Sequence, residues 1–158
     1  MRDIEDIMSK KIVTVDSYAT VEDAAKELKK HEIGSLIVTQ EKRTVGIVTE
    51  RDIAYKYVAS QKEISRSKDV RVKDIMTSTL ITQSLDDNLR IMDIIILMDE
   101  QKIKHVCITK KGKIVGMLAD RDIFRELSGT YLNSYKKIGK IKEMIRLKKQ
   151  KELQSKKR

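Results

Sequence analysis

Two short segments of the chain carry polar side chains in an order that is typical of a nucleotide site. In each, an Arg and an Asp follow an apolar run, as Arg51 and Asp52 do in residues 49–52. A carboxylate one turn into a helix can accept hydrogen bonds from ribose hydroxyls. Arginine binds phosphate through paired hydrogen bonds, and free N–H groups at a helix start favour the same anion. The spacing from Thr49 to Asp52 also fits a capping box that only closes a helix, and both roles can coexist.

The second of these segments, residues 119–122, belongs to the second copy of a tandem repeat in the chain. Three ordered matches recur at a nearly constant offset of 68 to 70 residues. They pair residues 6–9 with 74–77, 33–38 with 103–108, and 45–53 with 115–123. The second copy carries two additional residues, which we place in the loop 84–90. We therefore expect two copies of one structural unit.

Each copy has the pattern of a strand, a helix, two strands and a helix. We expect strands at 12–15, 36–39 and 45–48, a first helix opened by a capping box at Thr20, and a final helix in copy two that ends at Ser128-Gly129. Residues 91–98 form a helix that is apolar almost all round. Its second face should meet the other repeat or another subunit, and a dimer is the default.

The positive charge of the chain is concentrated at its C-terminus. The formal net charge is +10, of which residues 136–158 carry +9. We expect repeats at 1–67 and 68–129, followed by a basic amphipathic helix or tail at 130–158. Three interpretations of that tail remain open: docking on the module, binding of nucleic acid or another acidic partner through 136–158, and contact with an anionic membrane.

Several classes of protein are excluded by composition. One cysteine and two histidines favour neither a disulfide scaffold nor a zinc site, and suit a reducing cytoplasm. Cys107, within an apolar strand, should behave as a small buried hydrophobe. No apolar run is long enough to span a membrane. Without paired carboxylates, a Walker-type loop or a nucleophile with a base, we expect no enzyme activity, catalytic residue or bound metal.

The repeated motifs resemble a pair of cystathionine-β-synthase (CBS) domains, also called a Bateman module. The likeness rests on Asp-Ile-Met-Ser/Thr, Ile-Gly-Ser-Leu-Ile-Val and Gly-x-x-Thr-x-x-Asp-Ile, over residues 1 to about 128. It implies a mixed α+β (α/β-like) fold in which two β-α-β-β-α repeats pack with pseudo-twofold symmetry. It also implies a regulatory homodimer that requires no cofactor and binds AMP, ADP, ATP or S-adenosylmethionine in clefts between the repeats, signalling to a partner.

The resemblance also assigns site residues. It places the ribose carboxylate at Asp52 and Asp122, and a hydroxyl at Thr49 that Ala119 cannot supply in the second copy. The second site is therefore the doubtful one. His105 is either a structural strand residue or a partner of ligand phosphates. The full predicted set is Thr14, Ile33, Gly34, Ser35, Thr49, Arg51, Asp52, Thr82, Lys104, His105, Arg121 and Asp122.

Overall fold

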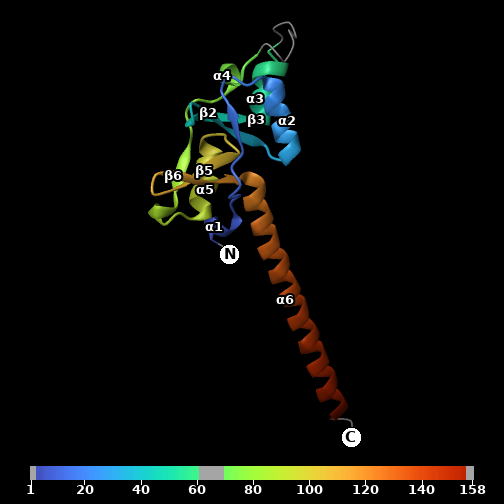
Figure 1. The fold of residues 1–158 in the computed structure, drawn as a ribbon. Helices are drawn as coiled ribbons and strands as arrows, with labels where there is room; N and C mark the ends of the chain where they lie inside the picture. The colour runs from blue at the N-terminus through green and yellow to red at the C-terminus, as the bar shows by residue number, and fades with distance from the viewer. Residues whose placement is uncertain (1–2, 61–69, 156–158) are drawn as a thin grey trace.

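The computed structural model describes residues 3–60 and 70–155, in which the two repeats build matching sets of elements (Figure 1). The first set is α1 (Ile4–Ile7), β1 (Thr14–Asp16), α2 (Val21–His31), β2 (Ser35–Gln40), β3 (Arg43–Thr49), α3 (Glu50–Asp52) and the π-helical η1 (Ile53–Val58). The second set is α4 (Val72–Ile75), β4 (Thr82–Ser84), the 3₁₀ turn η2 (Leu85–Asp87), α5 (Ile91–Glu100), β5 (His105–Lys110), β6 (Lys113–Ala119) and α6 (Asp120–Ser155).

Each repeat folds around one three-stranded sheet. β1 pairs parallel with β2 and β2 antiparallel with β3, and β4, β5 and β6 repeat this arrangement. Four residues separate β1 from α2, and six separate β4 from α5. The mixed α+β fold, the element order and the position of the two additional residues are confirmed. The predicted boundary after residue 67 lies outside the described residues.

The local sequence explains how α2 begins and which face it buries. Thr20 Oγ1 accepts a hydrogen bond from the Asp23 backbone N–H, and the Thr20 N–H donates to the Asp23 carboxylate, which completes the predicted capping box. Val21, Ala24 and Leu28 follow at helical spacing and are buried in the first core.

The short helices α1 and α4 are exchanged between the repeats. Ile4 and Met8 are buried in the core of the second repeat, whereas Val72 and Ile75 are buried in the core of the first. Each fully buried aliphatic side chain contributes roughly 1.5–3 kcal/mol to folding. The exchange therefore ties the two repeats into one cooperative module, an arrangement that the division by sequence does not reveal.

Close backbone approach explains the glycine in each repeated Val-Gly motif. A Cβ at Gly46 would lie 2.5 Å from the Thr77 carbonyl oxygen, and one at Gly116 would lie 3.0 Å from the Ser9 carbonyl oxygen. The segments that follow α4 and α1 bridge to the same strands, through Ile47 with Thr77 and Ser9 with Met117. Glycine is the residue that permits this contact.

Reciprocal arginine contacts reveal the pseudo-twofold packing of the repeats. Arg51 donates to the backbone carbonyl of Lys102 at 2.9 Å, and Arg121 donates to that of Glu32 at 3.2 Å. Both acceptors have a left-handed backbone and follow α5 and α2 respectively. Each arginine thus reaches from its own repeat to the end of a helix in the other, where a cation complements the helix dipole.

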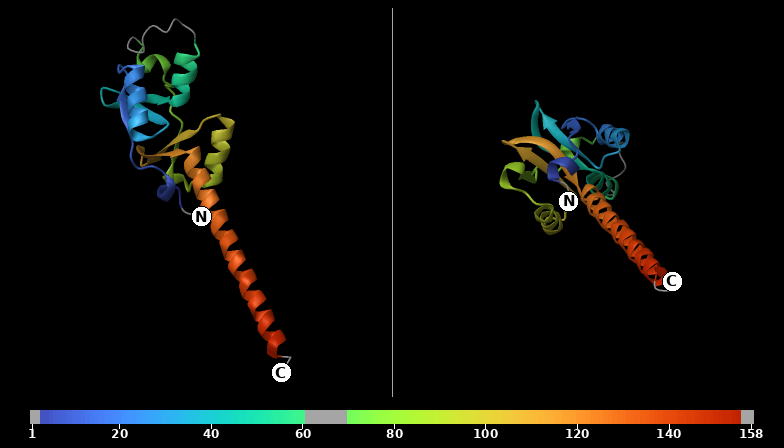
Figure 2. Two further views of the ribbon diagram at one scale, coloured as in Figure 1. Left: turned by 90° about the vertical axis from the view of Figure 1, so that its right-hand side faces the viewer. Right: turned by 90° about the horizontal axis from the view of Figure 1, so that it is seen from below.

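The last helix does not end at Ser128-Gly129, and that prediction is wrong. α6 continues through Gly129 to Ser155 and extends away from both repeats (Figure 2). With 36 residues it is about 54 Å long. Gly129 has open space around it and costs the helix about 1 kcal/mol relative to alanine. Leu132, Ile138 and Met144 are each more than half exposed, so these side chains do not dock on the module of their own chain.

The final helix of the first repeat also differs from expectation. It is α-helical only over α3 and continues as the π-helical η1. Ile53 and Tyr57 pack on the core of the first repeat, but Val58 is 63% exposed. In the second repeat Ile123 is buried, whereas Phe124 is 73% exposed. Each of these final helices therefore leaves a large apolar side chain on the surface of the chain.

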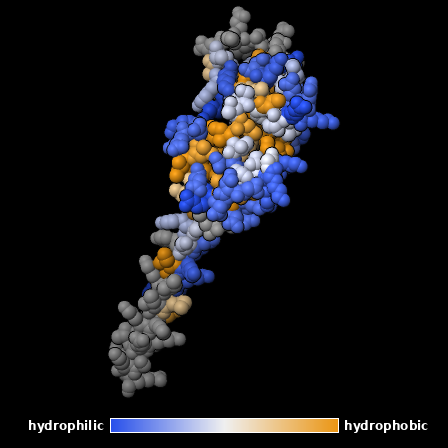
Figure 3. Space-filling view, turned by 90° about the vertical axis from the view of Figure 1, so that its left-hand side faces the viewer, coloured by the Kyte–Doolittle hydropathy of each residue, from blue (hydrophilic) through white to orange (hydrophobic). Residues whose placement is uncertain are grey.

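Helix α5 likewise leaves part of its apolar surface uncovered. Ile91, Ile94 and Met98 are buried, but Met92 and Ile96 are about half exposed. On the face shown in Figure 3, hydrophobic side chains gather near the middle of the module and hydrophilic ones surround them. The other repeat does not cover the second face of α5, which leaves another subunit as its expected cover.

Candidate functional site

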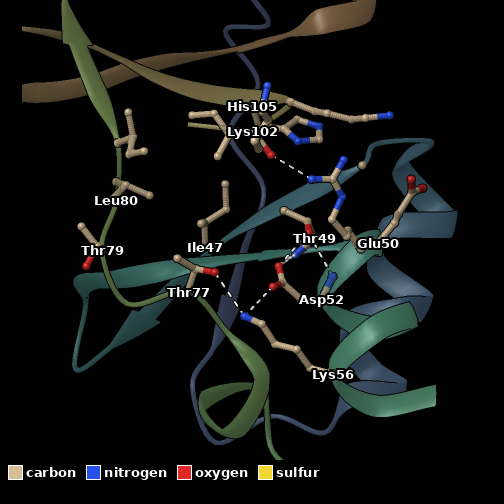
Figure 4. Close-up of a pocket in the computed structure, with 15 residues that line it drawn as sticks. Ile47, Thr49, Glu50, Asp52, Lys56, Thr77, Thr79, Leu80, Lys102 and His105 are labelled. Carbon is tan, nitrogen blue, oxygen red and sulfur yellow. Dashed lines mark hydrogen bonds and ion pairs between the residues drawn. The ribbon is translucent and has the colours of Figure 1, made fainter. Parts of the chain in front are cut away.

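A cleft of about 350 Å³ lies between the repeats and is lined by residues from both (Figure 4). Its size is within the range of small-molecule sites. Ile47 and Leu80 lie on one side, and the polar residues at the start of α3 lie on the other. The lining residues are Gly34, Ile47, Thr49, Glu50, Arg51, Asp52, Lys56, Thr77, Thr79, Leu80, Ile81, Lys102, Ile103, Lys104 and His105.

Asp52 is held rigidly at the polar side of this first cleft. Its Oδ2 accepts from the Thr49 backbone N–H at 2.8 Å and from Thr49 Oγ1 at 2.6 Å, and Thr49 Oγ1 accepts from the Asp52 N–H. Its Oδ1 lies 2.7 Å from Lys56 Nζ. The predicted capping box is thus present, and Asp52 is only 8% exposed. A carboxylate has about four acceptor positions, so Asp52 can still accept from a ligand hydroxyl.

Cationic groups approach the cleft from both repeats. Arg51 comes from the start of α3 and uses one of its N–H groups on the Lys102 carbonyl. Lys102 and Lys104 come from the segment before β5. A guanidinium has five N–H donors, so Arg51 retains donors for an anion while it spans the repeats.

His105 lies at the junction of the two repeats. A Cβ at Gly34 would lie 3.0 Å from His105 Nε2, and the histidine lines both clefts between the repeats. Burial lowers the pKa of His105. The carboxylates of Asp120, Glu50 and Asp122 partly offset this shift, whereas the charge of Arg121 adds to it. The imidazole is therefore biased toward its neutral form, and an anion placed beside it would favour the charged form.

The second cleft is much smaller than the first. Its volume is about 40 Å³, room for a few water molecules and not for a nucleoside. Asp122 Oδ2 accepts from the Ala119 N–H at 3.2 Å, and its nearest cation is Arg125, 4.0 Å away. The lining residues are Ser9, Lys11, Ile12, Val13, Ile33, Gly34, Ser35, Ile37, His105, Met117, Ala119, Arg121 and Asp122.

The structure brings ten of the twelve predicted site residues to one of the two clefts. Thr49, Arg51, Asp52 and Lys104 line the first, while Gly34 and His105 line both. Ile33, Ser35, Arg121 and Asp122 line the second.

Thr14 and Thr82 line neither cleft. They begin β1 and β4 and are exposed, opposite Ile37 and Cys107 in the sheets. The chain reaches the clefts just before these strands, at Val13 in the second cleft and Ile81 in the first. Thr14 and Thr82 therefore each follow a cleft-lining residue by one position, which is about 3.3 Å along an extended chain.

Sequence reasoning missed several residues of the first cleft. Lys56 had a usable signal, since it follows Asp52 by four residues and so shares its helical face. Thr77, Leu80 and Lys102 had none, because they reach the cleft only through the packing of one repeat on the other.

Cys107 is buried in β5 and behaves as predicted. It is 1% exposed, and its Sγ is 3.9 Å from Met117 Sδ. Burial raises the pKa of the Cys107 thiol to about 12, so the thiol stays protonated and unreactive near neutral pH.

Within residues 3–60 and 70–155, no group of three or more His, Cys, Asp or Glu side chains is arranged to hold a metal ion. None of the helices in these residues has the length and apolar character needed to cross a membrane.

Both repeats match one known sequence family. A family model described as the CBS domain matches residues 4–59 and again residues 72–129. The chain belongs to the CBS-domain family. The resemblance deduced from the repeated motifs is thereby confirmed, and the clefts described above are those of a CBS pair.

Relatives of this CBS pair include a curated protein and solved structures. An uncharacterized 17.7 kDa protein of Acidianus ambivalens is 33% identical over 126 residues, 78% of this chain and 72% of the relative. The CBS domain pair of protein MJ0100, solved with 5′-methylthioadenosine and S-adenosyl-L-methionine, is 31% identical. The structural match covers 80% of this chain and 96% of the MJ0100 chain, with a TM-score of 0.68.

A further solved relative is an oligomer. The hexameric CBS-CP12 protein from bloom-forming cyanobacteria is 28% identical, with a TM-score of 0.67 over 78% of this chain and 70% of that one. CBS pairs similar to this chain thus bind adenosine ligands in one case and assemble into oligomers in another. These relatives give no support to the nucleic-acid partner that the basic C-terminal segment suggested.

Proposed function

We propose that the chain is a regulatory CBS pair that binds an adenosine ligand in the first cleft and signals to a partner. The candidate ligands are AMP, ADP, ATP and S-adenosylmethionine. The observation that carries the proposal is the 350 Å³ cleft between the repeats, which combines a fixed carboxylate, an apolar side and several cations. A non-catalytic role agrees with the match of both repeats to the CBS domain.

The cleft suggests a place for each part of such a ligand. Ile47, Leu80 and Ile103 offer apolar surface for the adenine ring. Asp52 is available to the ribose hydroxyls, as an acidic residue is in dinucleotide-binding folds. Arg51 and the strand start at Lys104 and His105 are available to phosphate or another polar substituent.

A ligand in this cleft touches both repeats, which supports a signalling role. Arg51 already spans the repeats through the Lys102 carbonyl, so an anion that engages Arg51 also acts on the contact between them. A ligand can shift the equilibrium between two arrangements of the repeats only if it binds one arrangement more tightly than the other. We therefore propose that bound ligand favours one relative position of the repeats.

We further propose that two modules form a homodimer in the cytoplasm, with no cofactor required. The exposed apolar side chains of η1, α5 and the start of α6 support dimerisation, and the single buried, free thiol supports a reducing compartment. In this proposal residues 1–67 and 68–129 are the sensor repeats, and 130–158 is the basic amphipathic helix or tail expected from the sequence.

The test is calorimetric titration of the full chain with AMP, ADP, ATP and S-adenosylmethionine, with guanosine monophosphate as the control for the base. At least one adenosine ligand should bind with a stoichiometry of one per chain and raise the melting temperature. If none of the four binds and none shifts the melting temperature, the proposal is refuted.

A further inference from the structure

Lys56 is the cation that forms an ion pair with Asp52 in the first cleft. Its Nζ lies 2.7 Å from Asp52 Oδ1, 2.9 Å from the Ile75 carbonyl oxygen and 3.3 Å from Thr77 Oγ1. Figure 4 shows the ammonium group between Asp52 and Thr77. Three oxygen atoms from two segments of the chain thus hold one positive charge at the polar side of the cleft.

Lys56 makes the charge of the cleft more positive. The lysine compensates the carboxylate of Asp52, so the cleft offers no uncompensated anion at its ribose end. Charged side chains that line the cleft comprise four cations against two carboxylates. The cations are Arg51, Lys56, Lys102 and Lys104, and the carboxylates are Glu50 and Asp52. An excess of positive charge in a concave site concentrates anions.

Comparison of the two repeats shows that the fold does not require a lysine here. At the offset of 70 residues, the counterpart of Lys56 is Glu126, which is 6% exposed, and the counterpart of Asp52 is Asp122. The second repeat therefore has a carboxylate at the sequence position where the first has an ammonium group, and Glu126 Oε1 accepts a hydrogen bond from Thr130 Oγ1. The duplicated fold accepts a side chain of either charge at this position. Folding therefore does not fix that charge, which leaves it available for ligand binding.

We infer that Lys56 sets the charge preference of the first cleft. With Lys56 present, this cleft selects adenosine ligands of net negative charge over neutral or cationic ones. The inference rests on the proposed function, because it concerns the choice among the adenosine ligands named there. A sulfonium group that enters beside Asp52 meets a carboxylate already paired with Lys56 and an excess of cations. A phosphate group enters the same cleft with several cations to pair with.

The experiment compares three adenosine probes that differ in charge and share the nucleoside. AMP is anionic, 5′-methylthioadenosine is neutral, and S-adenosylmethionine is cationic. In calorimetry of the full chain at low ionic strength, AMP should bind at least about tenfold more tightly than either of the others, since unit charges several ångströms apart in a protein cleft interact at that level.

Substitution of Lys56 should then reduce this preference. Lys56→Met should weaken AMP binding about tenfold while it changes 5′-methylthioadenosine binding less than about threefold, and Lys56→Arg should retain the preference. Lys26→Met is the matched control, because Lys26 forms an i,i+4 ion pair with Glu22 at 2.8 Å outside the cleft. It should change neither affinity.

Each of the following results would overturn the inference. One is wild-type binding of 5′-methylthioadenosine or S-adenosylmethionine as tight as that of AMP, which would leave the proposed function intact. Another is an equal loss for all three probes in Lys56→Met, which would mark a structural role. If that variant melts before titration, wild-type salt dependence decides: AMP binding must weaken with added KCl more than 5′-methylthioadenosine binding does. If none of the three probes binds, the proposed function and this inference are both refuted.

Discussion

Replacement of Gly129 by alanine tests whether α6 is one continuous helix. In the structure Gly129 lies within α6, three residues after the buried Glu126, and a Cβ there would meet no atom within 4 Å. Its φ is not positive, unlike that of Gly112. Alanine is favoured over glycine by about 1 kcal/mol inside a helix. We therefore expect Gly129→Ala to raise the free energy of unfolding by about 1 kcal/mol.

The opposite sign follows if the helix ends at Gly129, as the Ser-Gly pair in the sequence predicts. A glycine after a helix end commonly adopts the left-handed conformation, in which alanine costs roughly 1–2 kcal/mol. The sign of one measurement thus distinguishes the two structures without a label or a ligand.

Urea unfolding followed by circular dichroism at 222 nm is the appropriate assay. In a chain of this size an increase of about 1 kcal/mol raises the melting temperature by roughly 2–4 °C. Gly112→Ala, in the turn between β5 and β6 at a φ of 71°, is the control and should lower stability. A loss of stability in both variants would refute the continuous helix.

Three further predictions concern the site and the assembly. Burial lowers the pKa of His105 in the folded chain, so the unfolded chain binds more protons as the pH falls below about 6.5. The free energy of unfolding should therefore decrease over that range, and His105→Gln should remove this part of the decrease, whereas His31→Gln should retain it. Because the second cleft is so small, Asp52→Ala should weaken adenosine-ligand binding about tenfold or more and Asp122→Ala much less; equal losses would contradict this ranking. Light scattering should give the mass of a dimer for the wild type and a smaller mass for Phe124→Glu, and an unchanged mass would exclude Phe124 from the interface.

Features that depend on neighbours in sequence were predictable. The capping boxes at Thr20 and Thr49 form as expected, because the residues that close them are three positions apart. The buried positions of α2 follow from apolar spacing along one helix. Because the chain is duplicated, each element occurs twice in the sequence. The strand order could therefore be predicted from each copy separately.

Features that depend on packing between distant segments were not predictable. The exchange of α1 and α4 between the cores leaves no local signal, since each helix has the same sequence pattern whichever core it enters. The continuation of α6 through Gly129 was missed because a Ser-Gly pair by itself favours a helix end, whereas α6 continues through it.

The sequence by itself determined that the chain is a tandem CBS pair, that Thr49 and Asp52 close a helix start, and that the basic charge lies in the C-terminal segment. Tertiary structure alone decided that the first cleft is roomy and the second almost filled, and that Lys56 and Lys102 join the first. The physical reason is that local hydrogen bonds and apolar periodicity act along the chain. The volume and charge of a cleft instead depend on which side chains two separate repeats bring together.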